Sequence, residues 1–106
     1  MDDEAIVLVD RDGVIRLWTA GSERMFGHSA AVAVGHTLDL IIPIEYREAH
    51  WSGFRRAIAS GETPAEGTVL SFPALHANGD VIERQGRLTL IRRPGSSVVA
   101  AVMVFE

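Results

Sequence analysis

The sequence predicts an α+β fold in which helices pack on one face of an antiparallel sheet. Two β-rich apolar runs separated by a turn open the chain, a helical region follows, and three further β-rich runs close it. Turns this short join neighbouring antiparallel strands. A central helical block between strands therefore predicts five strands with the helices segregated to one face.

Length and composition indicate a single domain covering residues 1–106, with enough apolar residues for a core. The chain has no cysteine, which excludes disulfides, thiolate nucleophiles and cysteine-held metals. A net charge of −4 with mixed signs disfavours a nucleic-acid surface. No apolar run approaches the roughly 20 residues of a membrane span. We expect a soluble, cytoplasmic domain that binds neither nucleic acid nor membrane.

The first half of the chain is predicted to form a hairpin and two short helices. Residues 5–9 and 14–18 are the hairpin strands around a turn at 10–13, whose glycine suits positive φ. The helices are 20–26 and 30–34, each preceded by a hydroxyl side chain that can serve as N-cap and followed by a glycine.

Residues 45–61 are predicted to form the one long helix, with Pro43 at its start and Gly61 at its end. Small and apolar residues recur every three or four positions and predict a stripe facing the core. They are Tyr46, Ala49, Gly53, Phe54, Ala57 and Ile58. His50 lies inside this stripe. From spacing alone, such a histidine is more often a hydrogen-bonded core residue than a ligand.

The second half is predicted to be β. Its strands are 65–76, 80–92 and 97–105, joined by a type I′ turn at Asn78–Gly79 and a further turn at 93–96. Pro73 implies a bulge or an edge strand because proline cannot donate to a ladder. The last strand is almost entirely apolar, which predicts a central position in the sheet.

Three segments resemble a PAS sensor domain: DGVIRLWTAGSERMFGHS, VGHTLDLIIP and YREAHWSGFRR. The resemblance covers nearly the whole chain. It implies a five-stranded sheet in the order 2-1-5-4-3 with helices folded over one face. It also implies a sensory or dimerising module, a homodimer, excised from a larger signalling protein.

The stretch IIPIEYREAHWSGFRRAIASGE is similar to the proximal helix of heme-binding PAS domains, as found in oxygen-sensing histidine kinases and heme-regulated phosphodiesterases. The similarity implies a b-type heme whose iron is held by His50, with Arg47 matching the arginine three residues before the ligand. Arg56 matches an arginine that contacts a heme propionate.

The residue types on this helix suit that hypothesis. A neutral imidazole binds heme iron through one ring nitrogen while the other donates to a backbone carbonyl. Gly53 leaves room for a flat macrocycle, and Phe54 follows it. Arg55 and Arg56 lie where heme carboxylates would emerge, and guanidinium pairs well with carboxylate.

The distal side departs from the pattern of the oxygen sensors. Leu70 stands where they carry an arginine that binds oxygen, and Thr68 stands where the phosphodiesterases carry a ligating methionine. Leu88 and Met103 are the apolar residues predicted for the distal wall. The gas ligand would be CO, NO or O2, with O2 weakly held because leucine donates no hydrogen bond. A change of iron redox state or a six-coordinate ligand swap is an alternative signal.

Two readings of function remain open. In the first, heme at His50 regulates an attached effector. In the second, the domain is heme-free and serves dimerisation, signal relay or the binding of another small ligand, with the sheet face or the N-terminal flank as the contact. Enzyme chemistry is not expected because the sequence shows no paired carboxylates, phosphate loop or nucleophile elbow. His28, His36 and His76 are expected to face solvent.

Overall fold

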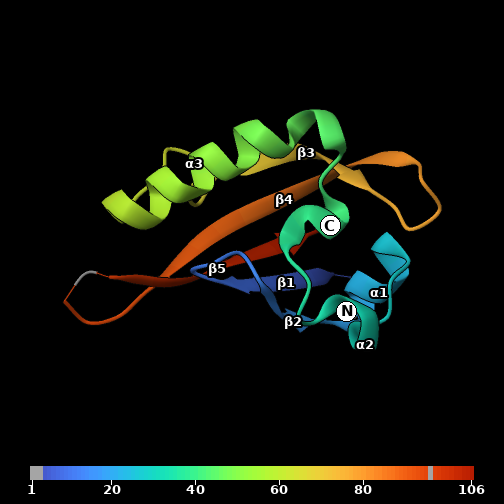
Figure 1. Cartoon of the computed structure of the whole chain (residues 1–106), viewed down its shortest axis with the longest axis horizontal. Coiled ribbons are helices and arrows are strands. Elements are labelled where there is room, and N and C mark those ends of the chain that lie inside the picture. Colours follow the sequence, from blue (N-terminus) through green and yellow to red (C-terminus); the bar gives the residue numbers. More distant parts are fainter. Residues whose placement is uncertain (1–3, 96) are drawn as a thin grey trace.

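The computed structural model describes residues 4–95 and 97–106 and contains a five-stranded antiparallel sheet in the order β2-β1-β5-β4-β3 (Figure 1). The elements are β1 (Ala5–Asp10), β2 (Ile15–Trp18), α1 (Ala20–Phe26), α2 (Ala30–Ala33), the 3₁₀ turns η1 (Leu38–Ile41) and η2 (Ile44–Tyr46), α3 (Arg47–Ser60), β3 (Val69–Leu75), β4 (Val81–Arg92) and β5 (Val98–Phe105). The helices lie on one face of the sheet, so the predicted fold class and strand order are confirmed.

Side-chain caps fix the helices of the first half. The Thr19 hydroxyl oxygen accepts a hydrogen bond from the Ser22 backbone N–H at 3.3 Å and another from the Ile6 N–H at 3.0 Å. The same side chain therefore starts α1 and ties it to β1. Gly27 ends α1 in the left-handed region, with φ 85°.

The long helix is shorter than predicted. Residues 44–46 form a 3₁₀ turn, and α3 proper runs Arg47–Ser60 instead of 45–61. A difference of this size is usual at helix ends, where the first turn tightens. Gly61 ends α3 as expected, with φ 82°.

The sequence-based prediction placed the start of the third strand too early, at residue 65. The structure starts β3 at Val69, because Pro64 has no N–H to donate and Gly67 takes a left-handed turn with φ 81°. Residues 62–68 instead form an irregular linker after α3. Pro73 does lie on an edge strand, as predicted, since β3 is the last strand of the sheet. The turn expected at 93–96 includes Ser96, which lies outside the described residues.

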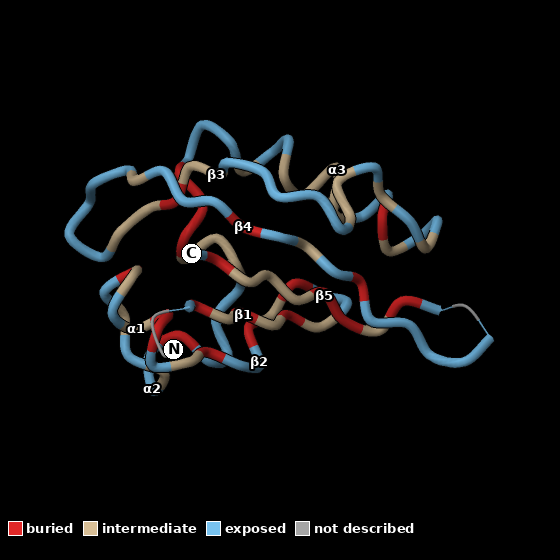
Figure 2. Tube along the Cα trace, turned by 180° about the vertical axis from the view of Figure 1, so that it is seen from behind, coloured by how far each residue is buried: buried red, intermediate tan, exposed pale blue. Residues whose placement is uncertain are grey.

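The core occupies only part of the space between the helices and the sheet. β5 is central, paired with β1 and β4, and its buried residues face a cluster with β1 and α1. Phe26 is fully buried there, between the rings of Trp18 and Phe105. By contrast, α3 contributes one buried residue, Ala57, and the rest of the helix is half-buried or exposed (Figure 2).

None of the helices in the described part of the chain is long and apolar enough to cross a membrane.

Candidate functional site

A cavity of about 500 Å³ lies between α3 and the inner face of the sheet. This volume is typical of small-molecule and cofactor sites. In the described residues its lining is apolar apart from His50, Tyr46 and Thr63, and it contains no Asp, Glu, Lys or Arg. The lining residues are Val7, Val9, Leu38, Ile41, Ile42, Tyr46, Ala49, His50, Gly53, Phe54, Ala57, Ile58, Thr63, Phe72, Pro73, Ala74, Leu88, Leu90, Ala101, Met103 and Phe105.

The predicted stripe of α3 faces this cavity. All six of its small and apolar residues line it, and His50 lies among them. Tyr46 and Ala49 are nevertheless exposed, because they face open space instead of packed side chains. The helical spacing therefore identified the correct face of α3 but not the void beneath it.

His50 packs against two aromatic rings that also contact each other, and it has an unsatisfied nitrogen. Its ring packs edge-on to Trp51, with centroids 4.7 Å apart, and stacks on Phe54 at 6.0 Å. Nδ1 is buried and has no hydrogen-bond partner. The carbonyl partner expected for that nitrogen is therefore not provided by the fold. A buried polar nitrogen without a partner costs free energy, which only a group that reaches Nδ1 itself would recover.

Burial holds the pKa of His50 below its ordinary value of 6.5. The negative charge of Asp39 raises this pKa, but its effect is smaller than that of burial. The imidazole is therefore neutral at neutral pH. A neutral imidazole has a free lone pair and is the form that binds a metal ion.

This shift predicts a loss of stability in acid. The unfolded chain binds a proton at His50 near pH 6.5, whereas the folded chain does so only at lower pH, so the free energy of unfolding decreases as the pH falls through 6.5. Urea unfolding at pH 7.5 and 5.5 measures the effect. The His50→Leu variant should lose less stability between these pH values than the wild type. An equal loss of stability in both proteins would contradict a lowered pKa of His50 in the folded chain.

The start of α3 is anchored to the preceding connector. The Trp51 indole N–H donates to the Asp39 carboxylate at 2.6 Å. The Arg47 guanidinium donates to the carbonyls of Ile42 at 2.9 Å and Asp39 at 3.2 Å. Arg47, matched by the resemblance to the arginine before the ligand, therefore fixes the helix end that carries His50.

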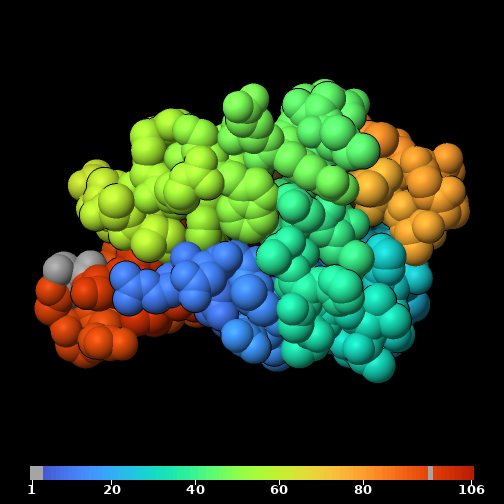
Figure 3. Space-filling view, in the orientation of Figure 1, coloured from blue at the N-terminus to red at the C-terminus, as the bar shows by residue number. Residues whose placement is uncertain are grey.

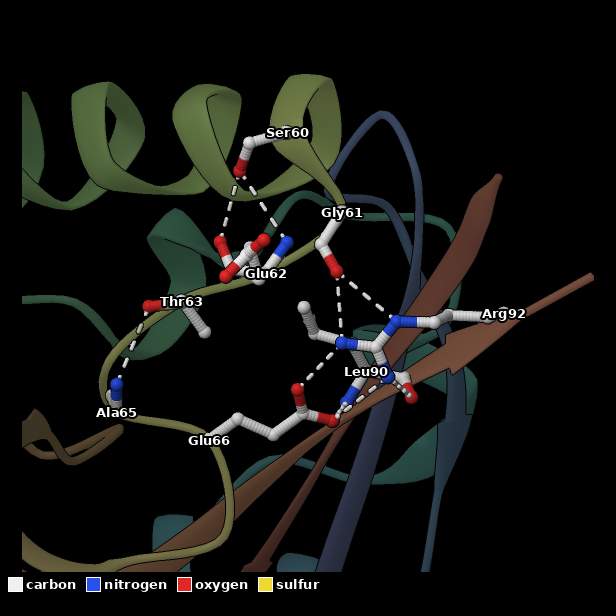
Figure 4. Close-up of polar contacts among 8 residues, drawn as sticks. All are labelled: Ser60, Gly61, Glu62, Thr63, Ala65, Glu66, Leu90 and Arg92. Carbon is white, nitrogen blue, oxygen red and sulfur yellow. Dashed lines mark hydrogen bonds and ion pairs between the residues drawn. The ribbon is translucent and has the colours of Figure 1, made fainter. Parts of the chain in front are cut away.

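The end of α3 is anchored by an ion pair shown in Figure 4. The Arg92 guanidinium donates to the Gly61 carbonyl, at 2.8 Å and 3.0 Å, and to both carboxylate oxygens of Glu66, the shortest at 2.7 Å. Glu66 also accepts from the Leu90 N–H. Hydrogen bonding from Arg92 lowers the pKa of Glu66. The cavity thus lies under a helix that is fixed at both ends by polar contacts.

Arg55 and Arg56 do not form one cluster. Consecutive helix positions point about 100° apart, and the two side chains line different hollows. Arg56 donates to the Ser52 hydroxyl at 2.8 Å and lies over Gly53, where a Cβ would be 3.8 Å from its guanidinium. Gly53 lines both the cavity and the hollow of Arg56. Arg56 is therefore beside the cavity, although neither arginine lines it.

The predicted distal residues divide into two pairs. Leu88 and Met103 are cross-strand partners on β4 and β5, and both line the cavity. Leu70 lies in the exposed first part of β3, Thr68 precedes that strand, and neither lines the cavity. The sequence reasoning missed the wall built by β1 and the connector, including Val7, Val9, Leu38, Ile41 and Ile42. Strand alternation in β1 was the available signal for the first two.

The remaining histidines lie away from the cavity. His36 is exposed, as expected, whereas His28 and His76 are half-buried. His28 packs against Trp18, which also donates to its backbone carbonyl at 2.8 Å. Among residues 4–95 and 97–106, no three His, Cys, Asp or Glu side chains are grouped to hold a metal ion. Within that described part, His50 is the one histidine on the cavity wall, which Tyr46 and Met103 also line.

Comparison with known proteins supports the fold. The family described as the PAS fold matches residues 3–106. The Bradyrhizobium diazoefficiens protein named Sensor protein FixL is 32% identical over 53 residues, half of this chain. The chain spans only 14% and 10% of the length of the first two curated relatives it matches.

Solved structures show the same fold. The PAS domain of a Colwellia psychrerythraea protein superposes with a TM-score of 0.83 at 22% identity, covering 98% of this chain and 85% of that one. The PAS domain of the Cronobacter turicensis RpfR quorum-sensing receptor, in complex with C12:0, superposes with a TM-score of 0.77 at 14% identity, covering 99% and 93%.

Proposed function

Because the chain belongs to the PAS family, we propose that it is the sensory domain of a larger signalling protein and binds one heme b beneath α3. In this proposal His50 is the axial ligand of the iron. One observation carries the proposal: the imidazole of His50, which burial keeps neutral, lies in the wall of an apolar cavity of about 500 Å³.

Several features of the site support heme. A single histidine is a sufficient protein ligand for heme iron. The aromatic ring of Phe54 and the bare backbone of Gly53 flank His50 on the same helix face, and the cavity is otherwise apolar. Half of the chain is 32% identical to a segment of FixL. Arg56 lies next to Gly53 and is the arginine placed to receive a carboxylate at that side.

When bound, heme supplies iron whose remaining coordination site takes a diatomic gas or whose redox state changes. The chain's own residues set the conditions for that chemistry. His50 holds the group to α3, and Leu88 and Met103 line the opposite wall on the sheet and exclude water. No charged side chain lines the cavity in the described residues, so we propose that CO or NO is favoured over O2. Leu70 and Thr68 do not contact the heme in this proposal.

The signal would leave the site through α3. A shift of His50 moves the neighbouring Trp51, whose indole is bonded to Asp39 in the connector. At the other end, Arg92 of β4 pairs with Glu66 of the linker and donates to the Gly61 carbonyl that ends α3. We propose that ligand-dependent movement of α3 between these two anchors biases the attached effector.

Titration of the purified domain with hemin tests the proposal. A Soret band distinct from free hemin should grow to a 1:1 end point and be lost in His50→Ala. His36→Ala is the matched control, since His36 is exposed and distant from the cavity lining. Free-hemin spectra with the wild type, or an unchanged band in His50→Ala, would refute it.

A second candidate is a heme-free domain that binds another apolar molecule. The apolar lining favours it, and the Cronobacter relative was solved with C12:0. This candidate predicts saturable binding of dodecanoate by the colourless protein, in His50→Ala as in the wild type. Loss of that binding in His50→Ala would count against it.

We propose further that the domain forms a homodimer through the face of the sheet that the helices leave uncovered. Leu8, Val102 and Leu17 lie side by side in the register of three strands, outside the core cluster, and Leu17 is 44% exposed. An apolar patch is self-complementary, as a two-fold interface requires. Sedimentation equilibrium should give a dimer mass that Leu17→Glu converts to a monomer. A monomeric wild-type protein would exclude this homodimer.

A further inference from the structure

We propose that a second hollow beside α3, which contains Arg11 and Arg55, binds the carboxylate of a ligand whose apolar body lies in the cavity. The inference rests on the proposed function only in placing a ligand under α3. It concerns the chemical class of that ligand and a residue, Arg11, that no sequence feature indicated.

The hollow has a volume of about 440 Å³ and a polar wall. Arg11 comes from the β1–β2 turn and Arg55 from α3, so segments distant in sequence meet there. Its described lining contains no carboxylate side chain. The lining consists of Arg11, Arg55, Ile58, Ala59, Ser60, Gly61, Ser97 and Val98.

Neither arginine has a partner within the described residues. Other arginines of this chain are engaged: Arg16 pairs with Asp10 at 2.9 Å, and Arg92 pairs with Glu66. Arg11 and Arg55 instead face one hollow together, in a chain whose net charge is −4. Two unneutralised like charges repel, and an anion between them relieves that repulsion while accepting their N–H groups.

Trp51 packs against the turn that carries Arg11. A Cβ on Gly13 would clash with the Trp51 ring, so the ring packs directly on the backbone of the β1–β2 turn. Arg55 follows Trp51 by one helical turn and so lies on the same flank of α3. In the space-filling view the first hairpin, in blue, adjoins α3, in yellow-green (Figure 3).

The hollow adjoins the cavity. Ile58 lines both spaces, and Val98, in the hollow, is a fully buried core residue. The Gly61 carbonyl at the end of α3 accepts hydrogen bonds from Arg92, which reduces the negative potential that a helix end would otherwise present to an anion. In the proposed complex, the apolar body of the ligand lies beneath Ala57 and Ile58, and its carboxylate end passes Ile58 to the two guanidinium groups.

The chemistry defines a ligand class. The body must be apolar, to match the cavity, and one end must carry a carboxylate, to match two arginines. Heme, through a propionate, and a fatty acid both satisfy this description. The titrations described below distinguish heme from a fatty acid as the source of the carboxylate.

Calorimetric titration of the heme-free protein with dodecanoate and with dodecanol tests the inference, since these probes differ only in the head group. Arg11→Gln and Arg55→Gln should each raise the Kd for dodecanoate roughly threefold to tenfold, because the arginines are solvent-exposed. The Kd for dodecanol should not change. Arg84→Gln is the matched control, an exposed arginine on β4 outside both spaces. Equal thermal unfolding midpoints establish that the variants fold alike.

Three results would overturn the inference. They are the absence of dodecanoate binding to the wild type, equal losses for both probes, and unchanged dodecanoate affinity in the arginine variants. Inorganic phosphate that binds with the same arginine dependence but does not compete with dodecanoate would also overturn it, since the hollow would then serve a free anion.

A parallel titration with hemin separates this inference from heme binding. If wild-type protein shows no coordinated hemin but dodecanoate binding depends on the arginines, heme is wrong and the carboxylate subsite stands. If hemin is coordinated by His50 and its affinity is unchanged in Arg11→Gln and Arg55→Gln, the propionates do not use this hollow.

Discussion

Replacing Ala57 by Phe is expected to abolish ligand binding in the cavity while the domain stays folded. Ala57 is the one buried residue of α3 in the structure as described, and it lines the cavity on the face that carries His50. A phenyl ring at this position would project into the void and occupy space that a ligand needs. We expect at least a tenfold rise in the Kd for hemin or dodecanoate, equivalent to about 1.4 kcal/mol.

Ala31→Phe is the matched control, because Ala31 is exposed on α2 and lines neither the cavity nor the hollow of Arg11 and Arg55. The ligand-free Ala57→Phe protein should stay folded and lose about 1–3 kcal/mol at most in urea, since part of the ring displaces core neighbours of Ala57 and the rest fills empty volume. Ligand binding by Ala57→Phe with wild-type affinity would show that the cavity is not the binding site.

Phe26→Ala is expected to cost the most stability of any substitution considered. The side chain is 0% exposed, and its ring lies 5.6 Å from the Trp18 ring and 5.2 Å from the Phe105 ring, measured between centroids. Truncating a buried phenylalanine leaves a cavity that neighbours fill only partly, at a cost of about 3–5 kcal/mol. A domain of this size has about 5–15 kcal/mol in total.

Chemical denaturation with urea measures this loss directly. Val32→Ala should change the free energy of unfolding by less than about 1 kcal/mol, because Val32 is half-exposed on α2. A loss below about 1 kcal/mol in Phe26→Ala would contradict the central role assigned to this residue in the packing of α1 on the sheet.

The fold followed from local signals that act independently of distant parts of the chain. Glycines at helix ends, the Thr19 cap and the apolar last strand all specify local conformation, and the elements they predicted are present. Helical spacing also placed His50 on the inner face of α3. The linker 62–68 was missed because β-rich composition outweighed the breaks imposed by Pro64 and Gly67.

The shape of the site could not be predicted in the same way. Whether a helix packs tightly or leaves a cavity depends on its height above the sheet. In this chain the hydrogen bonds of Asp39 and Arg92 set the height of α3, and they join residues that are far apart in sequence. The resemblance to heme-binding PAS domains put Leu70 and Thr68 at the site, but the linker after α3 places them outside the lining. Heme binding and its gas ligand stay predictions.

The most direct test of His50 as the iron ligand is chemical rescue of His50→Gly. The glycine variant removes the imidazole and leaves a hole of its shape. Hemin-loaded His50→Gly should lack the wild-type Soret band and regain it when imidazole is added, at concentrations that leave free hemin unchanged. A wild-type spectrum in His50→Gly without imidazole, or no recovery with it, would contradict the assignment of His50 as the ligand that holds heme beneath α3.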